Sequence, residues 1–137
     1  MKSKKTFLSS LTMALVLGSS VASAQTSIAC EYMLLRVYHA ELDHCRVALP
    51  KEREDRYQRM RAAMETFIRA NAKRDPEAMI AGIANNEKRA IAGLSSCQSE
   101  DFKLARQAID QLTDFSNERQ VTETLKVPRD PQRGTCG

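Results

Sequence analysis

Tryptophan is absent from this 137-residue sequence, and aromatic residues make up only 5% of it. Side chains that stack on nucleic-acid bases or on sugar rings are therefore scarce, which argues against both classes of ligand. No run alternates Val, Ile or Thr with polar residues, and no Asn-Gly pair marks a hairpin turn. Since these are the local signals of β-structure, an all-α fold is predicted.

Sequence motifs for catalysis or cofactor binding are also missing. The chain has no Gly-x-Ser-x-Gly turn for a nucleophilic serine, no Cys-x-x-Cys and no Cys-x-x-Cys-His. Its four cysteines are too scattered in sequence to form a zinc site. We therefore expect no catalytic, cofactor-binding or metal-binding residues, and a protein that is not an enzyme.

The only two histidines, His39 and His44, give little support for a metal site. Five residues apart on a helix, they point about 140° away from each other. Glu41 precedes His44 by three residues, a spacing used in di-iron bundles, but such sites need this motif from two helices. We therefore interpret the segment from Glu41 to His44 as part of a solvated helix face. Four methionines at helical spacing are interpreted as residues that fill the core and not as ligands of copper; they are Met33, Met60, Met64 and Met79.

The first 24 residues have the pattern of a cleaved signal peptide. Three lysines near the start precede an apolar segment over 7–17, and Ala22-Ser23-Ala24 is a small-x-small cleavage site. The apolar segment is too short for a permanent membrane helix, so no stable membrane insertion is expected after cleavage. The predicted mature protein begins near Gln25 and is periplasmic or secreted.

Charge gives no indication of a nucleic-acid partner. The full chain has 21 basic and 17 acidic residues, but three of the lysines belong to the predicted leader. The mature chain then keeps 18 basic residues against 17 acidic ones, a net charge near +1. Another protein is therefore a better expected partner than nucleic acid or an anionic membrane.

Helical periodicity runs through the mature chain. Helices are predicted over residues 28–49, 51–72, 76–93 and 99–112, followed by a short fifth one whose cap lies in Ser116-Asn117-Glu118. Gly82 inside the third helix suggests a close helix crossing. The sequence predicts a small antiparallel four-helix bundle over 25–127, with a possible short fifth helix, and an extended tail over 128–137.

Apolar stripes predict which side of each helix is buried. The first helix is expected to bury Cys30, Leu34, Tyr38, Leu42, Cys45 and Leu49. The second is expected to bury Tyr57, Met60, Met64, Phe67, Ile68 and Asn71. The third is expected to bury Met79, Ile80, Ile83, Ala84, Ala90, Ile91 and Leu94. The fourth is expected to bury Phe102, Ala105, Ile109 and Leu112.

The four cysteines allow three pairings, and helix geometry ranks them. Cys30 and Cys45 lie on one predicted helix at roughly 22 Å separation, whereas a disulfide needs Cα atoms within about 7 Å. In an up-and-down bundle, Cys45 and Cys97 meet at one end, and the tail returns Cys136 to Cys30 at the other. The predicted disulfides are Cys45–Cys97 and Cys30–Cys136. An alternative is acylation of Cys30, because Ser27-Ile28-Ala29-Cys30 is similar to a lipoprotein cleavage motif.

These features favour a non-enzymatic exported binding protein that acts through its surface, such as an inhibitor, an immunity protein or an envelope-stress protein. Arg53, Arg56 and Arg59 are the candidate partner surface, since arginine is enriched at interface anchors. One alternative is a carrier of a small ligand or metal inside the bundle, with Met and Tyr residues lining a cavity near His39 or His44. Another is an enzyme whose site carries no known motif.

Overall fold

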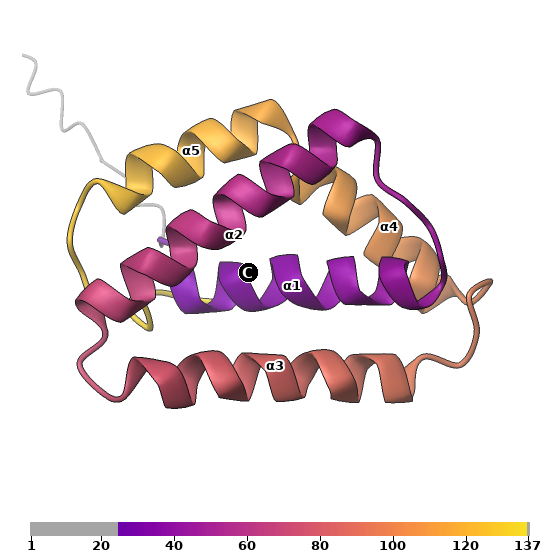
Figure 1. Ribbon diagram of the computed structural model, residues 1–137, viewed down its shortest axis with the longest axis horizontal. Coiled ribbons are helices and arrows are strands. Elements are labelled where there is room, and N and C mark those ends of the chain that lie inside the picture. Colours follow the sequence, from indigo (N-terminus) through magenta and orange to yellow (C-terminus); the bar gives the residue numbers. More distant parts are fainter. Residues whose placement is uncertain (1–24, 137) are drawn as a thin grey trace, which may run out of the picture.

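The computed structural model describes residues 25–136 and consists of helices joined by short loops (Figure 1). The leader predicted over 1–24 lies outside the described residues. Within them the fold is all-α, as predicted. The helices are α1 (Ile28–His44), α2 (Lys51–Asn71), α3 (Pro76–Gly93), α4 (Glu100–Leu112) and α5 (Phe115–Leu125).

Helix α1 occupies the centre of the bundle. It contacts α2, α3 and α4, while α5 packs against α2. Figure 1 shows α1 lying between α2 and α3, with α1 and α3 running in one direction and α2 in the opposite one. Helices α4 and α5 together make the fourth, returning pass, so the bundle is antiparallel.

Both predicted disulfides are present. Cys45 and Cys97 join the end of α1 to the loop after α3 with Cα atoms 5.6 Å apart. Cys30 and Cys136 join the first turn of α1 to the tail with Cα atoms 5.4 Å apart. Because Cys30 is bonded to Cys136, it has no free thiol to acylate, and the lipoprotein alternative is wrong.

Burial along α2 follows the sequence stripe, because this helix has one core-facing side. Five of its predicted core residues are buried, and Asn71 is half-buried; the five are Tyr57, Met60, Met64, Phe67 and Ile68. The α4 stripe is buried at Phe102, Ala105 and Ile109. Two of the four methionines, Met60 and Met64, thus fill the core as predicted.

Burial along α1 differs from its predicted stripe. Tyr32 and Leu35 are fully buried, although neither belongs to that stripe, whereas Leu34 and Tyr38 are only partly buried. The physical reason is the central position of α1, which has neighbours on three sides. A helix buried on several sides does not have one apolar face.

Helix α1 ends at His44, five residues earlier than predicted. Arg46 adopts a left-handed backbone with φ of 55°, and Val47 N–H donates to the carbonyl of Leu42. Together with the bond from Arg46 N–H to the Asp43 carbonyl, this forms a Schellman C-cap. The cap was missed because glycine normally marks this position, and here it is an arginine.

Three further expectations need correction. Gly82 of α3 makes no close helix crossing, since a Cβ placed there would have no atom within 4 Å. Of the predicted α3 core residues, only Ile83 is fully buried, because α3 covers one side of α1 at the edge of the bundle. The short fifth helix exists, but its cap is Asp114, whose carboxylate accepts from Ser116 N–H.

The tail is attached to the start of α1 by more than its disulfide. Ser27 caps α1, and its hydroxyl also donates to the Pro131 carbonyl at 2.8 Å. Thr26 and Thr135 form a short parallel bridge. Gly134 has φ of +122°, and a Cβ there would lie 2.2 Å from the Gln25 carbonyl oxygen, so only glycine fits. These contacts fix both ends of residues 25–136 at one end of the bundle.

Candidate functional site

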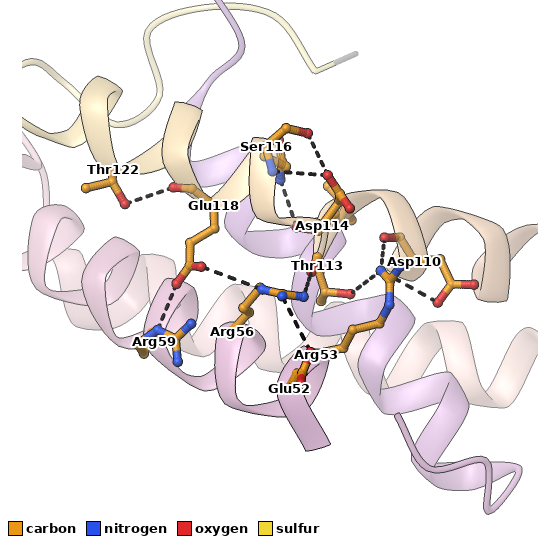
Figure 2. A network of polar contacts seen from close by, with 12 residues as sticks. Glu52, Arg53, Arg56, Arg59, Asp110, Thr113, Asp114, Ser116, Glu118 and Thr122 are labelled. Carbon is orange, nitrogen blue, oxygen red and sulfur yellow. Dashed lines mark hydrogen bonds and ion pairs between the residues drawn. The ribbon is translucent and has the colours of Figure 1, made fainter. Parts of the chain in front are cut away.

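The three arginines predicted as a partner surface have partners within the protein (Figure 2). Arg59 Nε donates to a Glu118 carboxylate oxygen at 2.7 Å, and Arg56 Nε lies 3.8 Å from the other oxygen. Arg53 donates to the carbonyl of Asp110 and to the hydroxyl of Thr113 at 3.4 Å. All three therefore reach from α2 to the α4–α5 corner.

This arrangement gives the arginines a clear structural role. Glu118 is only 17% exposed; it accepts a hydrogen bond from Arg59 and forms an ion pair with Arg56, which holds α5 against α2. An arginine already bound within the chain must give up those contacts before it can bind a partner. The partner surface at Arg53, Arg56 and Arg59 thus stays a prediction. Binding a partner there would cost the contacts that these arginines make within the bundle.

A cleft of about 510 Å³ lies at the other side of α2. Its walls are the second half of α1, the loop between α1 and α2, one stripe of α2, and Glu87 of α3. The lining residues are Arg36, His39, Ala40, Leu42, Asp43, Val47, Ala48, Leu49, Glu54, Tyr57, Gln58, Arg61 and Glu87.

His39 is held firmly in the wall of this cleft. Its ring stacks on Tyr57 with centroids 3.6 Å apart and planes 5° from parallel. Its Nε2 lies 2.8 Å from a Glu54 oxygen, and its Nδ1 lies 3.3 Å from an Asp43 oxygen. The imidazole is therefore fixed by contacts on both nitrogens and one face.

The other charged groups in the wall, except one, are also paired. Arg36 forms an ion pair with Glu87 and donates to the Tyr32 hydroxyl at 2.9 Å. Burial alone would raise the pKa of Glu54, but hydrogen bonds from His39 and Gln58 outweigh it and lower that pKa. Glu54 is therefore an ionised acceptor at neutral pH.

Arg61 and Tyr57 are the exceptions. Arg61 lines the cleft, and within residues 25–136 it makes no hydrogen bond or ion pair. Tyr57 is 4% exposed, and its hydroxyl has no hydrogen-bond partner among those residues. Burial raises the pKa of Tyr57 to about 12 despite the nearby positive charge of Arg61. Two unused donors, a guanidinium and a neutral phenol, therefore face the same cleft.

Sequence reasoning missed this site, although α2 carries a signal for it. Glu54, Tyr57, Gln58 and Arg61 are spaced i, i+3, i+4 and i+7, which places them on one helix face. The apolar stripe predicted for this helix places Tyr57 in the core and gives no sign of a cleft. Only the packing of α1 beside this stripe brings His39 and Arg36 to it.

The Glu-x-x-His segment is not the solvated face that was expected. Glu41 is 9% exposed, while His44 is exposed. Burial and the negative charge of Asp101 raise the pKa of Glu41. Within residues 25–136, no three His, Cys, Asp or Glu side chains are grouped to hold a metal ion.

We expect Glu41→Gln to raise the free energy of unfolding at pH 7, by on the order of 0.5–2 kcal/mol. The folded state favours the protonated carboxyl, so the wild type loses stability as pH rises through the raised pKa. The gain should vanish well below 4.5, the ordinary pKa, where both states of the wild type are neutral. Urea unfolding between pH 3 and 7 measures this, and a pH-independent difference would contradict it.

Comparison with known proteins provides no relative. No family model matches the chain, and neither a curated protein nor a solved structure matches it. In addition, no helix within 25–136 has the length and apolarity needed to cross a membrane. A functional assignment therefore depends on the geometry of the molecule.

Proposed function

We propose that this chain is a non-enzymatic exported binding protein that contacts another protein through the cleft between α1 and α2. The observation that carries the proposal is the presence of two unused donors, from Arg61 and Tyr57, in the cleft of about 510 Å³. Arginine and tyrosine are enriched among the residues that contribute most to protein interfaces. Inhibitor, immunity and envelope-stress proteins are the classes that fit such a surface.

Rigidity supports this proposal. The Cys45–Cys97 disulfide lies next to the loop that forms one cleft wall, and the Schellman cap fixes Val47 in that wall. A surface that is already ordered loses little conformational entropy on binding. The two disulfides also fit an oxidising compartment, which agrees with the predicted leader.

The lining of the cleft favours a protein partner over a small-ligand carrier. Pockets for small molecules are mostly apolar, whereas more than half of these lining residues are charged or polar. The carrier alternative expected Met and Tyr residues around a central cavity, yet no methionine lines this cleft. His39, which that alternative also named, is occupied by Glu54 and Asp43.

Filling the cleft tests the proposal. Ala48 is exposed and lines it, so Ala48→Trp should block it, whereas Ala62→Trp adds the same bulk to an exposed α2 position outside it. Mature protein carrying each change is immobilised and exposed to periplasmic and culture fractions of its own source. We expect at least tenfold less captured partner with Ala48→Trp and no change with Ala62→Trp.

A third variant separates the two candidate surfaces. Arg59→Gln alters the predicted arginine surface and leaves the cleft intact. Capture that survives Ala48→Trp but is lost with Arg59→Gln would refute the cleft and restore the arginine surface. Capture that is unaffected by all three changes would refute both surfaces.

A further inference from the structure

We infer that removal of the leader makes Gln25 a modification site, where the new α-amine closes onto the side-chain amide to give a pyroglutamyl end, assisted by Arg129. This inference rests on the exported part of the proposed function, because cleavage after Ala24 makes Gln25 the first residue. It follows from the contacts of Gln25, from the charge beside it and from the pocket that it lines.

Arg129 already holds the group that reacts. Its guanidinium donates to the side-chain oxygen Oε1 of Gln25 at 2.7 Å and to the carbonyl of Thr26 at 3.0 Å. A positively charged donor on Oε1 polarises the side-chain carbonyl, and it stabilises the negative charge that develops on this oxygen when an amine attacks. The contact therefore activates the amide of Gln25 for ring closure.

The backbone of Gln25 is fixed on the bundle at the same time. Its carbonyl accepts from Thr135 N–H at 3.1 Å, and Ser27 N–H donates to the Thr135 carbonyl at 2.9 Å. The disulfide between Cys30 and Cys136 ties this part of the tail to the first turn of α1. None of these bonds uses the Gln25 nitrogen, so the amine released by cleavage is free to attack. Amine and amide belong to one residue, and no second molecule has to approach.

The guanidinium also favours the reactive form of the amine. An α-amine is mostly protonated at neutral pH, and only its neutral form is a nucleophile. Arg129 is bonded to both Gln25 and Thr26, so an α-ammonium on Gln25 lies close to a like charge, which disfavours the protonated form. Ring closure removes this charge, and the lactam oxygen of the product can still accept from Arg129.

Glu31 supplies a carboxyl to the same site. A pocket of about 330 Å³ is lined by residues that precede α1, by α1, by α5 and by the tail; they are Gln25, Thr26, Glu31, Gln120, Val121, Thr124 and Arg129. Burial raises the pKa of Glu31 despite a hydrogen bond from Asn117, and a raised pKa suits a carboxyl to exchange protons near neutral pH. Glu31 is therefore the group that relays a proton during closure.

The reaction balances without any co-reactant. The α-nitrogen of Gln25 forms a bond to the side-chain carbonyl carbon, and the bond from that carbon to Nε2 breaks. One proton passes from the attacking nitrogen to the leaving one, and ammonia departs. Nothing is oxidised or reduced. The product has no terminal amine, so it carries one positive charge less than the open form and offers no free amine to an aminopeptidase.

The first experiment compares the folded protein with the same sequence as a free peptide. Mature protein is released from a fusion by a protease that leaves Gln25 first, and the reference peptide is Gln-Thr-Ser-Ile-Ala-amide. Intact mass at pH 7 follows the loss of one ammonia over time. We expect the protein to cyclise at least tenfold faster than the peptide. Closure in the protein that is as slow as in the peptide, or slower, would overturn the inference.

Variants assign the acceleration to the two side chains. Arg129→Gln should slow closure at least tenfold, Arg129→Lys should slow it less because the charge remains, and Glu31→Gln should slow it several-fold. Arg133 is exposed in the same tail and does not line the pocket, so Arg133→Gln is the matched control and should change nothing. The Cys30–Cys136 disulfide keeps the tail attached in every variant. An Arg129→Gln variant that closes at the wild-type rate contradicts the assignment.

Protein exported from the full precursor separates this inference from the proposed function. A first residue Gln25 that is blocked to Edman sequencing supports the inference, and an open Gln25 overturns it. Export with a different first residue overturns it as well and corrects the predicted cleavage site. A precursor that keeps its leader overturns both the inference and the exported part of the proposed function. Binding through the cleft is tested by Ala48→Trp, whose result does not depend on the state of Gln25.

Discussion

Replacing Cys45 and Cys97 together by serine is expected to lower the free energy of unfolding by about 2–4 kcal/mol. The disulfide closes a loop of 52 residues that contains all of α2 and α3. Without it, the unfolded chain gains conformational freedom, and the folded state gains nothing in return. For a bundle whose central helix relies on three neighbours, this is a large share of a typical total stability.

Urea unfolding of the double variant against the wild type measures this effect. The matched comparison is Cys30→Ser with Cys136→Ser, which opens a longer loop of 106 residues. That second variant should keep the tail partly attached, because Ser27 and Thr135 still hydrogen-bond across it. A Cys45/Cys97 variant as stable as the wild type would show that the bundle does not depend on this link.

Leu35→Ala is expected to cost about 2–5 kcal/mol, the range for emptying a well-packed leucine site. Leu35 is 0% exposed, in the middle of the central helix. The surrounding side chains come from several helices, so they cannot all relax into the space. The loss therefore combines the lost burial of the side chain with a residual cavity.

The control for this substitution is Leu104→Ala. Leu104 lies on α4 and is 61% exposed, so the same chemical change should alter stability by less than about 0.5 kcal/mol. Thermal and urea unfolding of both variants gives the difference. Equal losses at the two positions would contradict the placement of Leu35 in the core.

The disulfide pairing could be predicted because it follows from simple lengths. Cys30 and Cys45 lie at opposite ends of a continuous helix, which forbids a bond between them. The direction of each following helix then decides which cysteines meet. The α2 stripe was predictable for a similar reason, since one side of that helix faces the core and its apolar period is regular.

The end of α1 and its buried residues could not be predicted in the same way. Arg46 adopts a backbone conformation that sequence rules assign to glycine, and so the cap was missed. Leu35 and Tyr32 are buried because three helices surround α1, which no local period records. Gly82 was assigned to a crossing, although it lies on the open side of α3.

The sequence by itself determined the helices, the two disulfides and the antiparallel order, because each depends on local periodicity or on the length of a helix. The tertiary structure decided which charges are free. Arg53, Arg56 and Arg59 found partners at the α4–α5 corner, whereas Arg61 did not. These four arginines lie on one helix and look alike in sequence, and only the packing of the neighbouring helices decides which of them are paired among residues 25–136.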